Sequence, residues 1–192
     1  MLIIRKIALR INYWKYKIKL YRKVKFRGFT IIYQFPGATI NFGANIIINS
    51  DLFSNFIGIN HPSIIIARDG GKITIGNDVG MSGCTLYSLK EIDIGDRTII
   101  GGNCKIIDND FHPLSPHDRF LNIRENIKKQ KIIIGENVFI GANSIILKGT
   151  VIGNNSIVGA GSIVKGIFPD NVILGGNPAK VISEIRDYCK EC

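Results

Sequence analysis

The sequence predicts an all-β fold, a parallel β-helix built from six-residue repeats, and three observations support this prediction. β-Branched aliphatic residues recur at every sixth position from residue 134 onward, at Ile134, Ile140, Ile146, Ile152, Val158 and Val164. Glycine directly follows four of these six residues. Isoleucine also occurs in pairs and triplets elsewhere in the chain, and β-branched residues favour extended structure.

A strict period of six matches neither a helix, with a period of 3.6, nor an ordinary strand, with a period of 2. It matches a coil with flat six-residue sides, in which each aliphatic side chain points inward and successive coils pair as parallel strands. Glycine then follows where the chain turns a corner, because a corner demands positive φ or close backbone approach. Unrelated hairpins would have to share this spacing six times in succession, so the β-helix is the favoured interpretation.

A break in the repeat indicates where the chain leaves the coil. The same spacing occurs earlier, at Ile94, Ile100 and Ile106, but Ile134 lies 28 residues after Ile106 and 28 is not a multiple of six. We therefore expect one extruded loop over about residues 108–131, a stretch with two prolines and many charges. Such excursions from a rigid scaffold commonly carry function.

Three segments are expected along the chain: a basic amphipathic N-terminal segment (residues 1–23), a β-helix domain (24–182) and a C-terminal helix (183–192). In the first segment apolar residues recur at spacings of three and four, as on one side of a helix. They are Ile3, Ile7, Ile11, Trp14, Ile18 and Tyr21. Basic and apolar residues alternate from Lys15 to Lys19, which favours an early end to this helix. Both terminal segments are expected to cover the open ends of the prism that the stacked coils form.

The positive charge is concentrated in the N-terminal segment. The first 50 residues hold ten Lys or Arg, all between Arg5 and Arg27, and no Asp or Glu, whereas the other 142 residues hold fifteen of each sign. A nucleic-acid-binding protein would spread basic groups over a folded surface, so no nucleic-acid partner is expected. Two interpretations stay open: residues 1–27 contact an anionic membrane, or the apolar stripe packs on the prism and the cations are merely solvated.

Charged residues near the N-terminus also indicate the expected cellular location. Arg5, Lys6 and Arg10 interrupt the first apolar runs, so no secretory-signal core is evident. The expected location is the cytoplasm, with peripheral contact to the inner face of the membrane as a further expectation. The pair Cys189 and Cys192 forms a lone CxxC motif, which is a weak metal or redox signal.

The chain has three histidines, His61, His112 and His117, and His112 opens the expected loop. Histidine is the natural general base near neutral pH. The nearby carboxylates of Asp108 and Asp110 would orient its ring and stabilise the imidazolium that forms. These residues alone are equally consistent with a solvated loop histidine.

Three segments resemble the hexapeptide-repeat acyltransferases, above all the O-acetyltransferases of polysaccharide and lipopolysaccharide gene clusters and, more distantly, galactoside and maltose acetyltransferases. The segments are GMSGCTL (80–86), IGDRTIIGGNCKIIDNDFHP (94–113) and GGNPAKVI (175–182). The resemblance covers roughly residues 28–182 and implies left-handed triangular coils of eighteen residues. In that family the histidine of a His-Pro-aliphatic loop is the catalytic base, which corresponds here to His112.

The resemblance further implies a homotrimer with acetyl-CoA lying between two subunits. The matching cofactor positions are Gly141, Ala142, Ala160, Lys165 and Lys180, and Lys180 would meet a phosphate. Asp108, Asp110, Asn103 and Ser82 are candidates to support His112 or the acceptor. Galactoside acetyltransferases place Asn and Asp in the coil before the loop, where this chain has Met81, Gly83, Ser88 and Leu89. Simple galactoside specificity is therefore not expected.

The expected reaction is direct transfer of acetyl from acetyl-CoA to a hydroxyl of a sugar or glycan precursor, with His112 as the base and no resident metal. The Gly141–Ala142 peptide is the candidate donor to the oxyanion. No Ser or Cys lies in a recognisable nucleophile motif, so no acyl-enzyme is expected.

Two alternatives remain. A zinc hydratase similar to γ-type carbonic anhydrases would use the H-x4-H spacing of His112 and His117 with His61 as the third ligand. Two prolines inside that spacing, and its position outside the six-residue register, argue against zinc. The second alternative is a non-catalytic trimeric scaffold.

Overall fold

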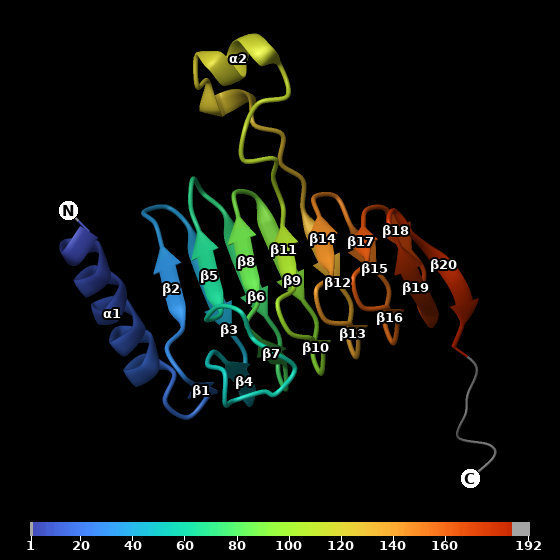
Figure 1. Cartoon of the computed structure of the whole chain (residues 1–192), viewed down its shortest axis with the longest axis horizontal. Coiled ribbons are helices and arrows are strands. Elements are labelled where there is room, and N and C mark those ends of the chain that lie inside the picture. Colours follow the sequence, from blue (N-terminus) through green and yellow to red (C-terminus); the bar gives the residue numbers. More distant parts are fainter. Residues whose placement is uncertain (1, 186–192) are drawn as a thin grey trace.

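The chain folds into a three-sided prism of stacked coils (Figure 1). The computed structural model describes residues 2–185, with side chains from residue 9 onward. The chain passes from a first sheet to a second and a third and then returns to the first, so each sheet takes every third strand up to β19, and β20 joins the first sheet beside β19. Strand pairing is parallel except in the final hairpin, and the predicted parallel β-helix is confirmed.

The three sheets contain the following strands. The first sheet is β1 (Val24–Arg27), β4 (Ile46–Asn49), β7 (Gly80–Ser82), β10 (Ile99–Ile100), β13 (Phe139–Ile140), β16 (Ile157–Val158), β19 (Val172–Gly176) and β20 (Ala179–Glu184). The second sheet is β2 (Ile31–Gln34), β5 (Ile64–Ala67), β8 (Thr85–Ser88), β11 (Lys105–Ile107), β14 (Ile145–Leu147) and β17 (Ile163–Val164). The third sheet is β3 (Thr39–Phe42), β6 (Lys72–Ile75), β9 (Glu91–Ile94), β12 (Ile132–Ile134), β15 (Val151–Ile152) and β18 (Ile167–Phe168).

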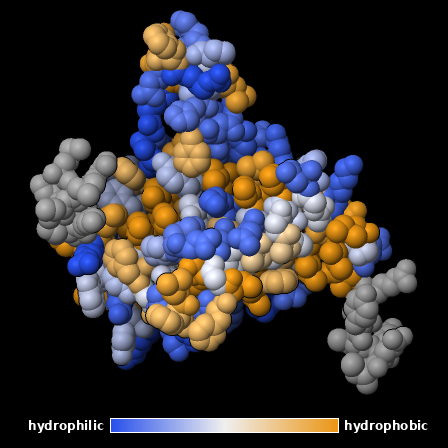
Figure 2. Space-filling view, viewed as in Figure 1, coloured by the Kyte–Doolittle hydropathy of each residue, from blue (hydrophilic) through white to orange (hydrophobic). Residues whose placement is uncertain are grey.

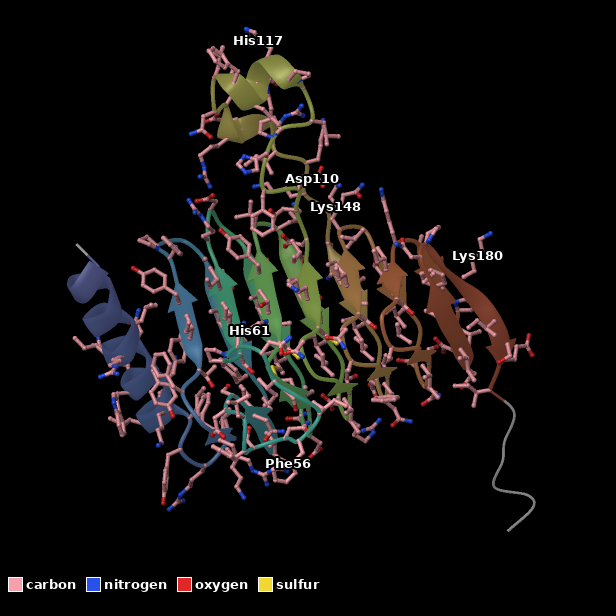
Figure 3. The ribbon with its side chains drawn as sticks, in the orientation of Figure 1. Phe56, His61, Asp110, His117, Lys148 and Lys180 are labelled. Carbon is pink, nitrogen blue, oxygen red and sulfur yellow. The ribbon has the colours of Figure 1, made fainter. Side chains whose placement is uncertain are left out.

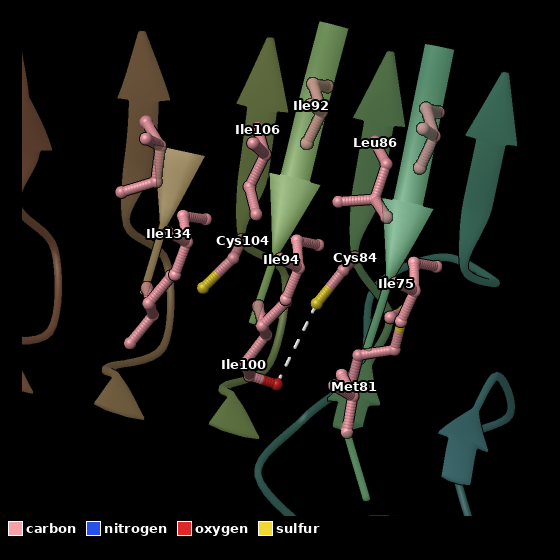
Figure 4. Packing of buried hydrophobic residues seen from close by; sticks show 14 of the residues in the cluster. Ile75, Met81, Cys84, Leu86, Ile92, Ile94, Ile100, Cys104, Ile106 and Ile134 are labelled. Carbon is pink, nitrogen blue, oxygen red and sulfur yellow. Dashed lines mark hydrogen bonds between the residues drawn. The ribbon is translucent and has the colours of Figure 1, made fainter. Parts of the chain in front are cut away.

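The repeated aliphatic side chains fill the interior of the prism. Ile140, Ile146 and Val158 are completely buried, as the period of six predicts. Figure 4 shows the packing in the central coils, where Ile94, Ile100 and Ile106 come from the third, first and second sheets. Burial of one such side chain contributes about 1.5–3 kcal/mol, so the stacked column supplies much of the stability of the fold.

At the corners of the prism, different residues provide close approach between coils and positive φ, two roles that the sequence could not distinguish. Gly135 and Gly141 follow inward aliphatics, and a Cβ at Gly135 would come within 2.7 Å of Asn154 Oδ1. Positive φ occurs two residues later, at Asn137 (55°) and Asn143 (62°). The glycines are therefore required for close approach between coils, while asparagine supplies the left-handed turn.

Helix α1 (Leu2–Lys19) covers the N-terminal end of the prism, beside β2 (Figure 1). It continues to Lys19, so the predicted early end is wrong. Tyr13 of the helix and Leu20 directly after it are buried, and the Tyr13 hydroxyl donates to the carbonyl of Gly28 at 3.2 Å. Among residues 2–185, no helix is both long enough and apolar enough to cross a bilayer.

The predicted apolar stripe of α1 faces away from the prism wherever its side chains are described. Ile11, Trp14, Ile18 and Tyr21 are 50%, 56%, 74% and 80% exposed. The interpretation in which this stripe packs on the prism is therefore wrong for these four residues. The side chains of Ile3 and Ile7 lie outside the described part of the chain.

The C-terminal end is closed by a hairpin. Strand β20 pairs antiparallel with β19 and continues to Glu184. A helix beginning at residue 183 is therefore wrong for the first three residues of the predicted segment, because residue 185, which follows β20, is not helical either. The rest of that prediction, and the pair Cys189 and Cys192, lie outside the described residues.

Two excursions leave the coil, from two different edges of the prism. Residues 51–63 connect β4 to β5, and residues 108–131 connect β11 to β12 and contain α2 (Pro116–Phe120) and a 3-10 helix (Arg124–Asn126). Figure 1 shows the second connection projecting from the prism, and Figure 2 shows that hydrophilic residues cover most of it. The first connection was not predicted, although Ile48 pairs with Met81 at a separation of 33 residues, which is not a multiple of six.

We name these two edges by their corner turns. The groove edge joins the first sheet to the second and includes Gly101–Gly102, Gly141–Ala142 and Gly159–Ala160. The loop edge joins the second sheet to the third and includes Asp108, Lys148 and Lys165.

Truncation of the inward column should destabilise the fold strongly. We expect Ile146→Ala to lower the free energy of unfolding by about 2–5 kcal/mol, because it leaves a cavity in a packed interior. Ile167→Ala is the matched control, since Ile167 is 81% exposed, and it should change stability by less than about 0.5 kcal/mol. Urea unfolding measures both, and equal losses would contradict the inward assignment.

Candidate functional site

His112 lies near the start of the 108–131 excursion and is exposed. A tight turn holds the backbone before it: Phe111 has a φ of 58°, and the His112 N–H donates to the carbonyl of Asp110 at 2.6 Å. The Phe111 ring packs against Tyr87 with centroids 4.8 Å apart. The turn therefore fixes the backbone of His112 and leaves its imidazole facing solvent in the single chain.

Asp108 anchors this excursion to the preceding coil. Its carboxylate is completely buried and accepts hydrogen bonds from the N–H groups of Leu89 and Lys90, each at 2.8 Å. It also accepts from Ser88 Oγ at 2.7 Å and Asn109 Nδ2 at 3.1 Å. With its oxygens so occupied, Asp108 positions the chain, and the predicted support of the His112 ring is not among its hydrogen bonds.

Asp110 is held differently, and one of its oxygens stays available. It forms an ion pair with Lys148 of the next coil, and Figure 3 shows the two side chains together at the base of the excursion. Its backbone N–H donates to the carbonyl of Lys128 at 3.1 Å. Asp110 Oδ2 is buried and has no hydrogen-bond partner among the described residues. This leaves a free acceptor two residues from His112.

Lys148 was missed in the sequence. It is one of two charged residues between Ile132 and Val164, the most regular part of the repeat. A lysine at the same edge of the prism, in the coil that follows the loop, is a signal that could have indicated an ion pair with one of the loop's carboxylates.

The groove edge is a column of small residues with free N–H groups. A Cβ on Gly101 would come within 2.6 Å of the Ala142 nitrogen, and one on Gly141 within 2.5 Å of the Ala160 nitrogen. The Gly141 N–H donates to the carbonyl of Val158 at 2.7 Å. Within residues 2–185, the N–H groups of Ala142 and Ala160 donate no hydrogen bond. This edge can therefore approach a ligand closely and donate to it.

A groove of 560 Å³ runs beside this edge, beneath the 51–63 excursion. Apolar Ile47, Ile99 and Phe139 line it together with polar Asn49 and Ser82. Asn49 Oδ1 is buried and accepts no hydrogen bond from the described residues. The groove thus combines apolar walls with an unused acceptor.

Ser82 and Asn103 hold the 51–63 excursion in place. Ser82 Oγ accepts from the side-chain amides of Asn49 at 3.0 Å and Asn55 at 2.9 Å. The Asn103 amide accepts from the Asn60 N–H at 2.9 Å and donates to the carbonyl of Gly58 at 2.8 Å. Neither residue forms a hydrogen bond with His112. Their contacts build the wall of the groove.

The candidate residues fall into two separate groups within one chain. Ser82, Asn103, Gly141, Ala142 and Ala160 belong to the groove edge, whereas His112 and Lys165 belong to the loop edge. Six residues separate Ala142 from Lys148 across the second sheet, a span of about 20 Å for extended chain. Lys180 is exposed on β20, at the C-terminal end of the prism (Figure 3).

The three histidines do not converge in one chain. Figure 3 shows His61 on the body of the prism and His117 at the far end of the excursion. His61 Nδ1 lies 2.9 Å from the Pro62 carbonyl, and His117 Nδ1 lies 3.5 Å from Asp118. In the part of the chain that is described, no three His, Cys, Asp or Glu residues cluster as metal ligands would.

Cys84 and Cys104 are buried in the core. The Cys84 Sγ lies 3.9 Å from the carbonyl of Ile100 (Figure 4), and burial raises the pKa of this thiol well above its usual value. A buried, protonated thiol is a poor nucleophile.

The sequence is similar to known repeat proteins and acetyltransferases. Residues 131–165 match the family described as "Hexapeptide repeat of succinyl-transferase". A relative from Escherichia coli K12, named as a candidate lipopolysaccharide biosynthesis O-acetyl transferase (WbbJ), is 29% identical over 89% of this chain and 87% of its own length. For three other curated relatives, the chain spans 34–65% of their length.

Solved structures share the fold. The polySia-specific acetyltransferase NeuO is 25% identical, with a TM-score of 0.58 over 88% of this chain and 73% of that chain. A variant of AntD, an N-acyltransferase from Bacillus cereus solved with coenzyme A and dTDP-4-amino-4,6-dideoxyglucose, is also 25% identical. Its TM-score is 0.55, over 79% of this chain and 85% of that chain.

Loss of the Asp108 carboxylate should loosen the excursion that carries His112. We expect Asp108→Ala to lower the free energy of unfolding by about 3 kcal/mol, because it leaves buried donors unpaired. Trypsin should then cleave faster after Arg119, which lies in the same excursion. Glu125→Ala, which removes an exposed carboxylate of the same excursion, should change neither measurement, and unchanged cleavage in Asp108→Ala would contradict the anchoring role.

Proposed function

We propose that the chain is a hexapeptide-repeat acetyltransferase, and that it transfers acetyl from acetyl-CoA to a hydroxyl of a sugar or glycan precursor. The observation that carries this proposal is the groove edge, where the free N–H groups of Ala142 and Ala160 line a column of small residues. The proposal includes the left-handed winding that the sequence resemblance implies. It also takes the 108–131 connection as the extruded loop that carries the base.

We propose that two copies complete each site. In one chain, His112 and the groove edge lie about one prism side apart. The base of one copy would therefore act on a substrate bound at the groove edge of its neighbour. Such a contact is head-to-tail, and head-to-tail contacts between identical subunits close into a ring. A homotrimer with three shared sites satisfies this requirement, because each copy would offer its loop edge to one neighbour and its groove edge to the other.

In the proposed reaction, acetyl-CoA supplies an activated acetyl thioester as cosubstrate. His112 takes the proton of the acceptor hydroxyl while that oxygen bonds to the acyl carbon. The Ala142 N–H donates to the oxygen that becomes negative in the tetrahedral intermediate. The carbon–sulfur bond then breaks, and His112 returns its proton to the departing sulfur. Acetyl ester and free thiol are the products, and no acyl-enzyme forms.

Asp110 is the better candidate to position the His112 ring. Its Oδ2 is buried and has no partner among the described residues, whereas the Asp108 carboxylate is occupied by four donors. A carboxylate that accepts from one imidazole nitrogen fixes the tautomer and stabilises the imidazolium. Lys148 holds the other Asp110 oxygen in place.

Two lysines are proposed to contact the cosubstrate away from the reacting atoms. Lys165 is exposed on the loop edge, and Lys180 is exposed on β20. Cations with long side chains at these positions suit the phosphates of coenzyme A. Lys165, on the loop edge, would come from the copy that supplies His112, and Lys180 lies at the C-terminal end of the prism, so the two would hold an extended molecule lengthwise.

The acceptor is proposed to be a carbohydrate. The names of WbbJ and NeuO refer to lipopolysaccharide and polysialic acid, and both are built from sugars. The groove supports this choice with the unpaired Asn49 Oδ1 between apolar walls, since sugars offer both hydroxyls and apolar faces. A cytoplasmic location belongs to the same proposal.

Removal of the base should abolish most turnover and spare cosubstrate binding. We expect His112→Ala to lower kcat by roughly 10²–10⁴-fold, the usual contribution of a general base, with little change in coenzyme A affinity. Thiol release from acetyl-CoA measures turnover, and calorimetry measures binding.

His117→Ala is the matched control, because His117 belongs to the same excursion and is exposed. It should keep most of the activity. Equal losses in both variants, together with loss of bound zinc, would instead support the zinc hydratase. Absence of acetyl transfer to any sugar acceptor would favour the scaffold.

A further inference from the structure

Helix α1 presents two different faces. Tyr13, together with Leu20 directly after the helix, is buried against the prism, while Ile11, Trp14 and Ile18 are between 50% and 74% exposed. With about 100° between successive helical residues, the three exposed side chains share an arc of about 60° on the side away from the prism. The apolar stripe is therefore presented outward by a helix that is already docked through its other side.

Cations border this outward stripe on both sides. By the same helical spacing, Arg10 and Lys17 lie along one border, and Lys15 and Lys19 lie along the other. Lys17 Nζ lies 4.9 Å from the centroid of the Trp14 ring. Long basic side chains beside apolar ones can keep their charged ends in a polar layer while the apolar side chains insert more deeply.

From this arrangement we infer that α1 is a docking surface for an anionic lipid bilayer, lying in the interface with Ile11, Trp14 and Ile18 inserted. An interfacial helix combines one apolar face with bordering cations. Tryptophan suits the boundary between headgroups and acyl chains.

Charge favours a bilayer over a second copy of the chain. Residues 1–50 carry ten basic and no acidic side chains, so stacking one α1 on another would bring cations against cations. An anionic leaflet supplies the opposite charge along the whole helix. The inference does not depend on the proposed acyl transfer.

The test is sedimentation of the full-length protein with phosphatidylcholine vesicles, with and without phosphatidylglycerol. We expect binding to the phosphatidylglycerol vesicles at low salt and release at high salt, where the charges are screened. Lys15→Gln with Lys19→Gln should weaken binding on the order of 30-fold, since each cation contributes roughly fivefold. Trp14→Ser with Ile18→Ser should weaken it at least as much.

Matched controls come from the 108–131 excursion. Phe120 is 88% exposed, so Phe120→Ser removes an apolar side chain of similar exposure, and Lys128→Gln with Lys129→Gln removes two exposed cations. Both controls should bind as the native protein does. Circular dichroism checks that each α1 variant remains folded.

Three outcomes would overturn the inference. In the first, the native protein stays in the supernatant at low salt. In the second, the control variants lose binding as much as the α1 variants do. In the third, Trp14→Ser with Ile18→Ser changes the mass measured by light scattering, which would show that the stripe contacts another copy.

Discussion

The inward column of branched aliphatic side chains determines where every other feature of the molecule can lie. One such residue from each of three sides fills the narrow interior, as Ile94, Ile100 and Ile106 do in the central coil. The sides of the prism must therefore stay flat and short, and any extra residues must leave the coil at a corner. Both excursions obey this constraint, because each begins where one sheet passes to the next.

The same constraint keeps the two halves of the proposed site apart. The 108–131 excursion leaves at the loop edge, while Ala142 and Ala160 occupy the groove edge. The strands between them are paired on both sides, as Ile106 is paired with Leu86 and Ile146. A rigid side of this kind cannot bend to bring the edges together. In the proposed trimer, a second copy would supply the missing half without any deformation of the coil.

The six-residue period was sufficient to predict the interior, because burial of Ile140, Ile146 and Val158 follows directly from the repeat. It could not assign the corner roles, since glycine serves both close approach and positive φ. It also could not reveal which side of α1 packs on the prism. The sequence offers two apolar sides that could pack on the prism, one with Tyr13 and Leu20 and a more regular one with Ile11, Trp14 and Ile18. Only the tertiary contacts show that the first of these is buried.

At the candidate site, residue types were easier to predict than partners. His112 was identified by its place in the loop, but the carboxylates before it looked equivalent. The fold separates them, because Asp108 turns into the preceding coil while Asp110 reaches Lys148 of the following one. The 51–63 excursion was missed because the clear six-residue repeat begins only after it, at Ile94, so no break in the period marks its position. Its asparagines bind Ser82 and Asn103 from a distance in sequence.

The central claim, that each site is shared between two copies, is tested most directly by subunit complementation. His112→Ala removes the proposed base, and Ala142→Glu blocks the groove edge with a charged side chain, so each variant alone should be inactive. In trimers mixed at random from equal amounts, about a quarter of the sites would pair an intact loop edge with an intact groove edge, and activity should return to about that fraction. Mixed assemblies as inactive as the parents, or a native mass near the 21.3 kDa of one chain, would contradict the account.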